Sequence, residues 1–563
     1  MNIIEHIKSK FGIVKNNEEK SEEVLQKVEV TPSIFFPNKP FDECVKEANE
    51  DKEAKEIFDT LTKEIEKFNI AKSQVCDSDS FIIKKALLDY KNKLEKLTNK
   101  LIEKNPNVLF LIEEEYNRNL GMMLAHAGIE NITLKILDNP YLSSMQDKEG
   151  HNIGMFAASN GLKKATSKAL ENPIASIQQD RNGRNIGMYA AMEEGLDVET
   201  IKALENNKAS LQQDKFGYNI GMLAAMYSKN KEVLEKTLEN TEAGLQQDKD
   251  GKNIGMHLVK NIAHHLALTS YEDVLLKVLD NEFACMQQDK DGDNIGILVA
   301  FYGYKQATLK ALDNLVAANQ QNDQGFNIGM AAATKILDDE VDYKSLSNPV
   351  ASVQQTKDGD NIGMFIAKRF VNSSNGSGKY RNPELLIYAL QNKEACLQQN
   401  QYGENIGMYL ANNDYVPDYV VSYALKNKEA SLQQDKNGRN IGMVAVMSKR
   451  SVDLILEAME NEEALMQKDA GSDGILERCE TYDRDDVFFE IIKRGLDKKP
   501  IFNDFINNVE ISGQERLLKG EILGLNFGLE ICAEQYRIPT DQIREKIIVA
   551  EETVLSEESE MEE

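Results

Sequence analysis

The sequence of 563 residues is poor in cysteine, in cations and in long apolar runs. Its six cysteines are scattered without any Cys-x-x-Cys pair, which argues against a disulfide framework or a zinc ribbon and favours a reducing compartment. Lysine and arginine number 66 against 93 aspartates and glutamates, and the formal charge is −27. Because phosphate-backbone ligands require clustered cations, we expect no nucleic-acid partner, and a basic protein partner fits the charge better.

Membrane-spanning and secretory signals are also missing. No segment approaches the roughly 18 to 20 apolar residues that cross a bilayer. The start of the chain carries Glu5, Lys8 and Lys10 where a secretory signal peptide has an apolar stretch. We therefore expect a cytoplasmic protein without membrane insertion.

Recognisable catalytic and metal-binding motifs are absent from the sequence. The first 100 residues and the segment after Pro500 contain no Ser/His/Asp order, nucleotide loop or paired-carboxylate motif, and neither Cys44 nor Cys76 has a histidine nearby in sequence. Ser373 replaces the first glycine of the phosphate loop that residues 376–379 otherwise resemble. Histidine and cysteine are common metal ligands, and they occur at His257, His264, His265 and Cys285. Their spacing matches no recognised metal-binding pattern. We expect no enzymatic activity, cofactor or metal.

One short phrase, Asn-Ile/Leu-Gly-Met/Ile, is abundant instead and occurs ten times. Successive copies are 33 to 44 residues apart, most often 33 or 34. Such a period is typical of a stacked repeat array, in which each repeat buries its apolar face against its neighbours. We place this array at residues 105–499. The copies begin at Asn119, Asn152, Asn185, Asn219, Asn253, Asn294, Asn327, Asn361, Asn405 and Asn440.

The repeat from Asp180 predicts a turn, a helix, a loop and a second helix. Residues 180–183 have turn chemistry, and Asn185 suits a helix N-cap. A short helix then runs toward Gly195. The second helix ends near Asn206 and has an apolar stripe at i, i+3 and i+6, namely Val198, Ile201 and Leu204.

The glycine inside the phrase is unexpected, because a helical glycine costs about 0.5 to 1 kcal/mol relative to alanine. We infer that the missing side chain lets a neighbouring helix approach closely. Gly221→Ala is therefore expected to lower the melting temperature through a steric clash. The methionine and alanines that follow are interpreted as core, and Cys285 and Cys396 as small packing residues that replace Ser176, Ser210 or Gly244.

A Gln-Gln pair precedes most of the turns. Stacked copies are expected to bond each other from repeat to repeat, as amide ladders do, and so to hold the framework. The pairs begin at Gln178, Gln212, Gln246, Gln287, Gln320, Gln354, Gln398 and Gln433.

The order of turn aspartate, glycine, helix cap and paired alanine resembles the ankyrin repeat, whose usual phrase is Gly-x-Thr-Pro-Leu-His-x-Ala-Ala. The matching stretch is residues 183–191, and it departs from the family with Asn, Ile, Gly and Met in place of Thr, Pro, Leu and His. The resemblance implies an all-α fold: an α-solenoid of about ten to eleven ankyrin-like helix-turn-helix repeats with helical caps at both ends.

The same resemblance implies a concave surface, made of turn tips and first helices, that binds a protein. Exposed aromatics at tips are common binding anchors, although single exposed apolar residues are ordinary on any surface. Carried over by position, the tip residues are Arg181, Asn182, Arg184, Lys215, Phe216, Tyr218, Gln401, Tyr402 and Glu404. The exposed first-helix pairs are Met192 with Glu193 and Met226 with Tyr227.

The ends differ from the array. Residues 1–104 form an N-terminal region with a charged segment at 16–28 and helical patterns at 41–68 and 80–104, and the latter either cap the stack or form a coiled coil with another chain. The expected apolar face is Phe81, Leu87, Leu88, Leu94, Leu97 and Leu101. Two insertions, near residues 262–271 and 372–382, are expected in loops. A degraded eleventh repeat from Gly471, a helical cap at 500–550 and an acidic disordered tail at 551–563 complete the chain.

Three functions follow from these features. The leading hypothesis is a non-enzymatic scaffold that binds a partner protein on the repeat surface. Its glutamate-rich tail is similar to the export signals of bacterial type IV secreted effectors, many of which carry ankyrin repeats, so export into a host cell by a non-Sec route is part of this hypothesis. The alternatives are an enzyme whose catalytic part lies in a terminal region, with the repeats recruiting its substrate, and a protein that self-associates through its stack ends. The partner and the oligomeric state do not follow from the sequence.

Overall fold

The computed structural model describes residues 40–75, 81–265, 271–335, 337–372, 382–494 and 496. This part of the chain is mostly α-helical, and its β structure is one hairpin of β1 (Ile112–Glu113) and β2 (Arg118–Asn119). The all-α class is confirmed. No described helix is both long and apolar enough to span a lipid bilayer. The chain divides into two compact units, residues 1–215 and 216–563, and this boundary lies inside the predicted array.

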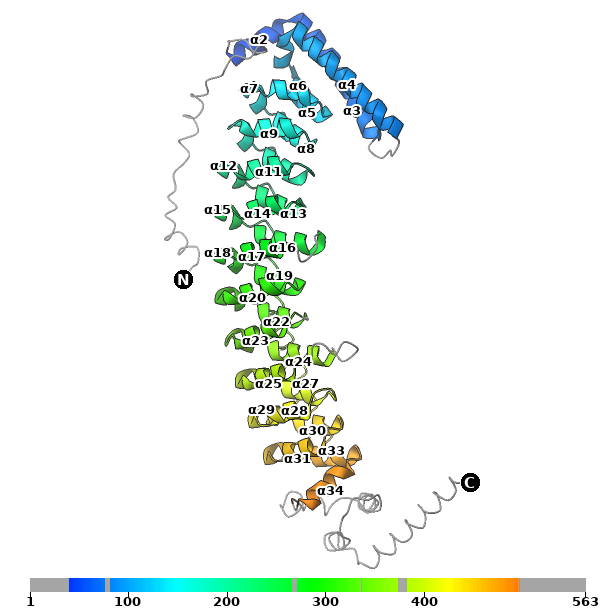
Figure 1. Ribbon diagram of the computed structural model, residues 1–563, viewed down its shortest axis with the longest axis vertical. Coiled ribbons are helices and arrows are strands. Elements are labelled where there is room, and N and C mark those ends of the chain that lie inside the picture. The colour runs from blue at the N-terminus through cyan, green and yellow to red at the C-terminus, as the bar shows by residue number, and fades with distance from the viewer. Residues whose placement is uncertain are drawn as a thin grey trace, which may run out of the picture. The chain divides into compact units, whose positions relative to one another are not determined.

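The N-terminal unit begins with α2 (Phe41–Glu50), α3 (Lys52–Val75), α4 (Phe81–Lys104) and the short η2 (Pro106–Phe110). After the hairpin come three groups of three helical segments (Figure 1). They are α5 (Leu120–Ala127), α6 (Glu130–Ile136) and α7 (Pro140–Ser144); α8 (Ile153–Ser159), α9 (Lys163–Glu171) and η3 (Ala175–Ile177); and α10 (Ile186–Met192), α11 (Asp197–Leu204) and α12 (Asn207–Ser210).

The C-terminal unit repeats the same grouping. Its first four groups are α13 (Ile220–Tyr227), α14 (Lys231–Lys236) and α15 (Thr241–Gly244); α16 (Ile254–His265), α17 (Glu272–Val278) and α18 (Glu282–Met286); α19 (Ile295–Tyr302), α20 (Lys305–Asp313) and α21 (Leu315–Ala318); and α22 (Ile328–Ala333), α23 (Asp339–Ser347) and η4 (Ala351–Val353). The remaining groups are α24 (Ile362–Asn372), α25 (Pro383–Gln391) and α26 (Lys393–Leu397); α27 (Ile406–Ala411), α28 (Asp418–Leu425) and α29 (Lys428–Leu432); α30 (Ile441–Met447), α31 (Val452–Ala458) and α32 (Glu462–Met466); and α33 (Ile475–Thr481) with α34 (Asp485–Lys493).

Equivalent helices contact one another from group to group. In the C-terminal unit, α13, α16, α19, α22, α24, α27, α30 and α33 form one such series, and α14, α17, α20, α23, α25, α28, α31 and α34 form a second. Each full group has three helical segments, so the expected pair of helices was incomplete. The third segment is three to five residues long and is too short to be stable alone.

The buried face of the second helix differs from the predicted stripe. In α11, Leu204 is buried and Ile201 is half-buried, but Val198 is exposed. Thr200 is buried in its place, and its hydroxyl donates to the Leu196 carbonyl over 2.9 Å. The helix contacts α9 as well as α10, so the neighbouring helices, and not the most apolar stripe, decide which side is buried.

The phrase asparagine is a buried N-cap in all ten copies, as predicted. In the group that begins with Asn327, its Oδ1 accepts from the Met330 amide over 2.8 Å. Its Nδ2 donates to the Ala351 carbonyl over 2.9 Å and to Oε1 of Gln354 over 2.8 Å. One side chain therefore caps the first helix and binds both the third segment and the glutamine after it. The other nine caps are equivalent.

The phrase glycine faces the isoleucine of the next phrase. A Cβ placed on Gly221 would lie 2.5 Å from Cδ1 of Ile254. A Cβ on Gly255 would lie 2.6 Å from both Cδ1 of Ile295 and Cγ1 of Val278. Carbon atoms in contact are normally about 3.5 to 4.0 Å apart. The close approach that the sequence predicted is confirmed.

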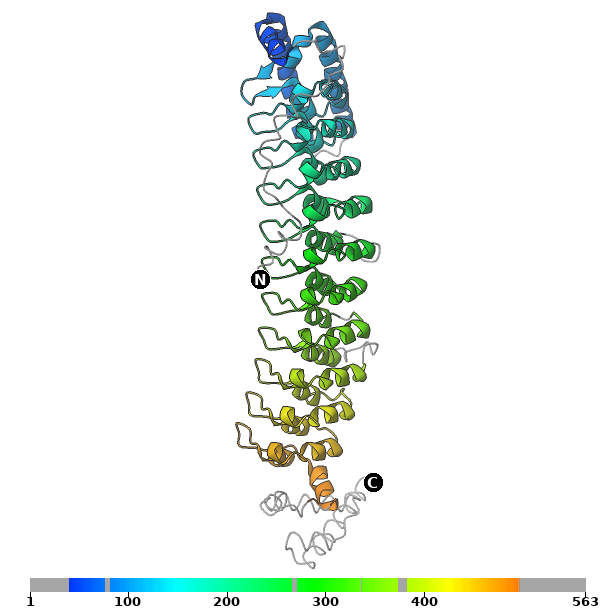
Figure 2. The same ribbon diagram turned by 90° about the vertical axis from the view of Figure 1, so that its left-hand side faces the viewer.

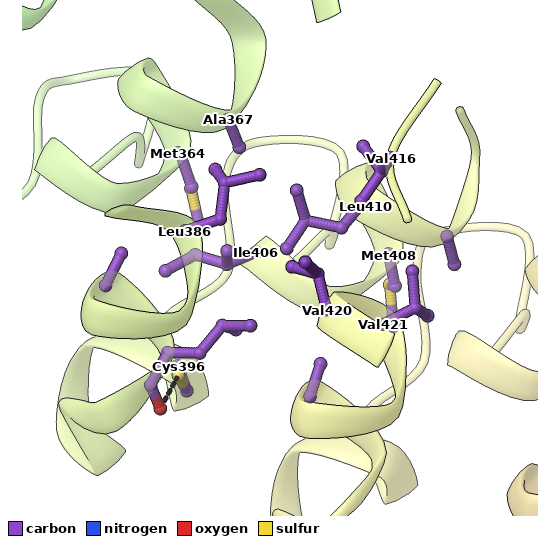
Figure 3. Packing of buried hydrophobic residues seen from close by; sticks show 14 of the residues in the cluster. Met364, Ala367, Leu386, Cys396, Ile406, Met408, Leu410, Val416, Val420 and Val421 are labelled. Carbon is purple, nitrogen blue, oxygen red and sulfur yellow. Dashed lines mark hydrogen bonds between the residues drawn. The ribbon is translucent and has the colours of Figure 1, made fainter. Parts of the chain in front are cut away.

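The methionines and alanines of the phrase are core residues, as predicted. One buried cluster runs from Met330 in α22 to Ala458 in α31. Figure 3 shows part of it, where side chains of α24, α25, α27 and α28 meet around Leu386 and Ile406. Cys396 is buried beside the Leu390 carbonyl, 3.2 Å from its Sγ, and burial raises the pKa of Cys396 to about 12. The interpretation of Cys396, and of the equally buried Cys285, as packing residues is confirmed.

A buried arginine ties the loop after α30 to the end of the preceding first helix, α27, and to the loop that follows α27. The Arg450 guanidinium donates to the carbonyls of Ala411, Val416 and Leu410, over 3.1, 2.5 and 2.6 Å. It also contacts Oδ1 of Asp418 at 3.2 Å. Only 5% of Arg450 is exposed, so its charge is balanced almost entirely by carbonyl dipoles and one carboxylate.

The N-terminal helices cover the first group of the array. α3 and α4 pack on each other, α3 contacts α5 and α4 contacts α6. The expected apolar face of α4 is partly wrong, because Leu88 and Leu97 are exposed, whereas Leu94, Thr98 and Ile102 are buried. Leu87 and Leu101 are half-buried, and the side chain at position 81 lies outside the described residues.

Both insertions lengthen a first helix before any loop begins. α16 extends to His265 and α24 to Asn372, so placing the insertions wholly in loops was wrong; residues 266–270 and 373–381 lie outside the described part. The eleventh group is present as α33 and α34. The predicted charged segment at 16–28, the cap at 500–550 and the acidic tail at 551–563 also lie outside the described residues.

Candidate protein-binding surface

The turns that precede the first helices form a bonded row in each unit (Figure 2). Each turn donates one main-chain hydrogen bond to the turn before it. In the C-terminal unit, for example, the Lys249 amide donates to the Phe216 carbonyl and the Lys290 amide to the Asp250 carbonyl, both over 2.9 Å. The same bond links every following turn as far as Ala470 and Asn437. The backbone of the surface is therefore held rigidly.

The Gln-Gln pairs bond each other from group to group, as predicted, but the acceptors are main-chain carbonyls and not the side-chain amides of a ladder. In the pair 287–288, Gln288 Nε2 donates to the carbonyls of Gly292 in its own turn and Gln321 in the next, over 2.6 and 3.0 Å. Gln287 Nε2 donates back to the Leu245 carbonyl over 2.6 Å. The bonds between groups thus run from side chain to main chain, which satisfies carbonyls that no helix or sheet uses.

Each turn is shaped by the residue at its start. Oδ1 of Asp180 accepts from the amides of Asn182 and Arg184, both over 2.8 Å. Gly183 has φ +80°, and a Cβ there would lie 3.0 Å from the Asp214 Cα in the next turn. The predicted turn chemistry is confirmed, and glycine is required both by its positive φ and by the adjacent backbone.

The second oxygen of the turn aspartate binds side chains of the first helix and of the neighbouring turn. Oδ2 of Asp180 accepts from the Tyr189 hydroxyl over 2.7 Å and lies 3.5 Å from Nε2 of His151. Burial opposes ionisation of Asp180, but hydrogen bonds from His151, Tyr189 and two amides prevail and lower its pKa to about 2. The pKa of His151 is raised by its hydrogen bond to Asp180, against the opposing effect of burial. The surface therefore contains fixed charges.

His257, one of the histidines considered above as a metal ligand, instead binds the turn aspartate of its group in the C-terminal unit. Its Nε2 lies 2.9 Å from Oδ2 of Asp248, and its ring packs edge-on against Tyr218 with the centroids 5.8 Å apart. His264 packs against Tyr302 in the same manner, with the centroids 5.7 Å apart. In the part of the chain that is described, no group of three or more His, Cys, Asp or Glu residues is arranged to hold a metal ion.

The predicted basic tip residues of the N-terminal unit are engaged with their neighbours. Arg181 is exposed and pairs with Glu149 at 3.1 Å. Arg184 is half-buried and contacts the buried Asp214 at 3.4 Å. The exposed Lys215 donates to the half-buried Asn182 side chain over 2.6 Å. Of the three predicted cations, Arg181 and Lys215 are exposed and Arg184 is half-buried.

The predicted aromatic tips differ in accessibility. Phe216 is 45% exposed and Tyr402 is 58% exposed, whereas Tyr218 is half-buried against His257. Gln401 is exposed and Glu404 is half-buried. Phe216 and Tyr402 are thus exposed to solvent, and the Tyr218 ring packs against Phe216, with the centroids 6.2 Å apart.

The first-helix pairs behave alike in both units. Glu193 in the N-terminal unit and Tyr227 in the C-terminal unit are exposed. Met192 and Met226, which precede them, are half-buried, so the expectation that both members of each pair are exposed was wrong. Each methionine lies at the C-terminal end of its first helix, directly after two buried alanines.

Sequence reasoning missed an aromatic tip in the N-terminal unit. Tyr116 stands three residues before its phrase asparagine, as Phe216 and Tyr402 do, and is 46% exposed. It borders a cavity of about 500 Å³ between α3, the hairpin and α5, whose floor includes Ile65 and Met123. The shared position was the signal that identifies Tyr116.

The turn surface combines exposed side chains with a hydrogen-bonded backbone. It presents aromatic rings and charged side chains on a backbone fixed by turn-to-turn bonds, and the buried thiols of Cys285 and Cys396 have their pKa raised to about 12 by burial. No protein-family model matches the chain, and no curated protein shows a significant sequence match to it.

Proposed function

We propose that this chain is an ankyrin-like solenoid that acts as a non-enzymatic scaffold and binds a protein on its turn surface. The assignment to an ankyrin-like fold is supported by the stacked equivalent helices, the capped first helix and the hydrogen-bonded row of turns. The third helical segment and the Asn-Ile-Gly-Met phrase are its departures from the usual repeat. Catalysis by a terminal region and export through the acidic tail stay predictions, because residues 497–563 are not described.

The observation that carries the proposal concerns one position of the turn, three residues before the phrase asparagine, where the side chain is aromatic in some turns and not in others. The residue three before the phrase asparagine takes part in the turn-to-turn bond through its main-chain carbonyl at Tyr116, Phe216 and Tyr402. The side chain at this position is aromatic and exposed in these three turns. Exposed aromatics on a rigid backbone lose little entropy on binding and are frequent anchors of interfaces.

The same position favours a basic partner. In four other turns it is an exposed carboxylate, at Glu149, Asp250, Asp291 and Asp358. Together with the formal charge of −27, these carboxylates would attract and orient a cationic protein surface.

Affinity capture with the full-length chain tests the proposal. The variant Phe216→Ala/Tyr402→Ala removes two exposed rings and keeps Tyr218, which loses its contact with Phe216 but retains the one with His257. We expect proteins recovered by the wild type to be lost with this variant and kept with the control Val198→Ala, which removes an exposed residue of α11. Recovery of the same proteins with both variants would reject the turn surface.

A further inference from the structure

The third helical segments carry a second surface whose composition changes along the C-terminal unit. In each group of this unit with a third segment, an asparagine precedes that segment, and its side chain caps the segment in every case but Asn461. The two residues that follow this asparagine differ between groups. These two positions are exposed and polar at Thr241–Glu242, Lys393–Glu394, Lys428–Glu429 and Glu462–Glu463. In two consecutive groups between them both positions are apolar, and in the group before these the second position is apolar while the first is the exposed Glu282. The apolar residues of these three groups are Phe283, Leu315, Val316, Pro349 and Val350, which we call the third-segment apolar row.

The apolar row faces solvent. Leu315 is 63% exposed, Val316 57% and Val350 48%; Pro349 is exposed and Phe283 is half-buried. The three groups are neighbours, because α18 contacts α21 and Gln354 donates to the Asn319 carbonyl over 2.7 Å. A single exposed apolar residue is ordinary, but a row across three groups, bounded by charged residues on both sides, is typical of an interaction surface.

In the N-terminal unit a helix packs on the aromatic residue at this position, which is still 56% exposed. Tyr141 is the second residue after the capping Asn139 and thus the counterpart of Val316. Phe41, the first residue of α2, stacks on it with the ring centroids 5.4 Å apart and the planes at 18°. Phe41 also packs edge-on against Phe110, at 5.9 Å. The first residue of a helix can therefore pack on a large side chain at this position, as Phe41 of α2 does on Tyr141.

Spacing and charge define the occupant further. Packed neighbouring helices lie about 8 to 10 Å apart, and seven residues of α-helix rise about 10.5 Å. A helix lying along the row would bring residues at heptad spacing over successive third segments. Three exposed carboxylates, Glu242, Glu282 and Glu394, and one exposed lysine, Lys393, flank the row. The net charge beside the row is therefore negative, and basic residues beside the apolar ones would complement it.

We propose that the third-segment apolar row binds an amphipathic helix of a partner protein, with large apolar residues at heptad spacing and lysine or arginine beside them. This surface lies on the third segments and does not include the turn tips. The two surfaces can therefore be tested independently.

A binding titration with a synthetic probe tests the inference. The probe is a labelled helical peptide of about 18 residues, long enough to cover three segments, with leucine at heptad positions and lysine between them. A scrambled peptide of the same composition measures non-specific attraction to an acidic protein. Both peptides are titrated at raised salt, which screens this electrostatic attraction. The full-length chain should bind the ordered peptide more tightly than the scrambled one.

The decisive variant replaces four apolar residues of the row with the charged residues that neighbouring groups have at the same positions. Leu315→Lys/Val316→Glu/Pro349→Lys/Val350→Glu reproduces the Lys-Glu pairs that α26 and α29 carry at the same positions, so the fold should be kept, as circular dichroism would verify. We expect it to weaken binding of the ordered peptide by roughly tenfold or more. The turn variant Phe216→Ala/Tyr402→Ala should leave this affinity unchanged.

Three results would overturn the proposal. They are equal affinity of the wild type and the four-residue variant, equal affinity for ordered and scrambled peptides, and no measurable binding at all. Light scattering adds a fourth: if the wild type gains mass with concentration and the variant does not, the row is a self-association surface and not a site for a partner helix.

Discussion

Replacing Gly221 by alanine adds one methyl group at a place where two first helices meet. Alanine favours a helix over glycine by about 0.5 to 1 kcal/mol, so without neighbours the substitution would stabilise. The added Cβ, however, would lie 2.5 Å from Cδ1 of Ile254 and 3.3 Å from its Cγ1. Overpacking of a filled core costs about 1 to 3 kcal/mol. Because Cδ1 is the free end of its side chain and can rotate away, we expect a net loss of about 0.5 to 1 kcal/mol.

The cost should rise where the neighbour cannot move. At Gly255 the added Cβ meets Cγ1 of Val278 as well as Cδ1 of Ile295, each at 2.6 Å, and a helical valine is nearly confined to one rotamer. Gly255→Ala should therefore cost about 2 kcal/mol. Urea denaturation of the full chain, with hydrogen exchange of the amides in the two helices as a local measure, should rank Gly255→Ala below Gly221→Ala and both below the wild type.

A double substitution isolates the clash from every other effect. Ile254→Val removes Cδ1 and alone should cost about 1 kcal/mol. In Gly221→Ala/Ile254→Val the added methyl has lost its nearest contact, so the double variant should be about as stable as Ile254→Val, with a coupling near 1 kcal/mol. Additive losses, or a Gly221→Ala protein more stable than the wild type, would refute the reasoning.

Three further predictions follow from buried polar groups. Arg450→Met should lower the free energy of unfolding by about 3 kcal/mol, because the carbonyls that the guanidinium binds lose their donors, and Arg450→Lys should recover only part of this loss. The pKa of His151 is raised by Asp180, so the stability it contributes is present below the unfolded pKa of about 6.5 and is lost as the pH rises through the folded value; His151→Phe should therefore destabilise more at about pH 5 than at about pH 9. Asn327→Asp keeps the N-cap acceptor but turns a carboxylate toward the Ala351 carbonyl, and it should cost more than Asn327→Ser, about 3 against 2 kcal/mol.

Urea denaturation at matched ionic strength measures all three. Arg450→Lys as stable as the wild type would show that the planar fork of donors is unimportant. A His151→Phe penalty that grows with pH would contradict the assigned pairing with Asp180. Equal stability of the two Asn327 variants would mean that capping alone, and not the donation by Nδ2, holds that side chain in place.

Local chemistry explains what was predictable. The N-cap at Asn185, the turn at residues 180–183 and the small residue at Gly221 each follow from backbone requirements that hold wherever the residue stands. The period of the phrase implies stacking, because a helix of seven or eight residues cannot bury its own apolar face. Tyr116 was within reach of the same reasoning, since it shares the turn position of Phe216 and Tyr402.

Other features depend on the neighbours that each group meets. The third segment 207–210 is too short to be read from periodicity, and Asn206 and the adjacent group stabilise it. Thr200 is buried in place of Val198 because α9 and α10 lie against that side of α11.

The sequence by itself therefore determined the spacing of the groups and the cap of each first helix in this protein, since those properties arise within one group. Only the tertiary structure decided which face of each second helix is buried, where the Gln-Gln side chains donate, and which turn residues are left exposed to a partner. Each of those outcomes is set by atoms of the adjacent group, which lie more than thirty residues away along the chain and act through steric fit and the satisfaction of buried polar groups.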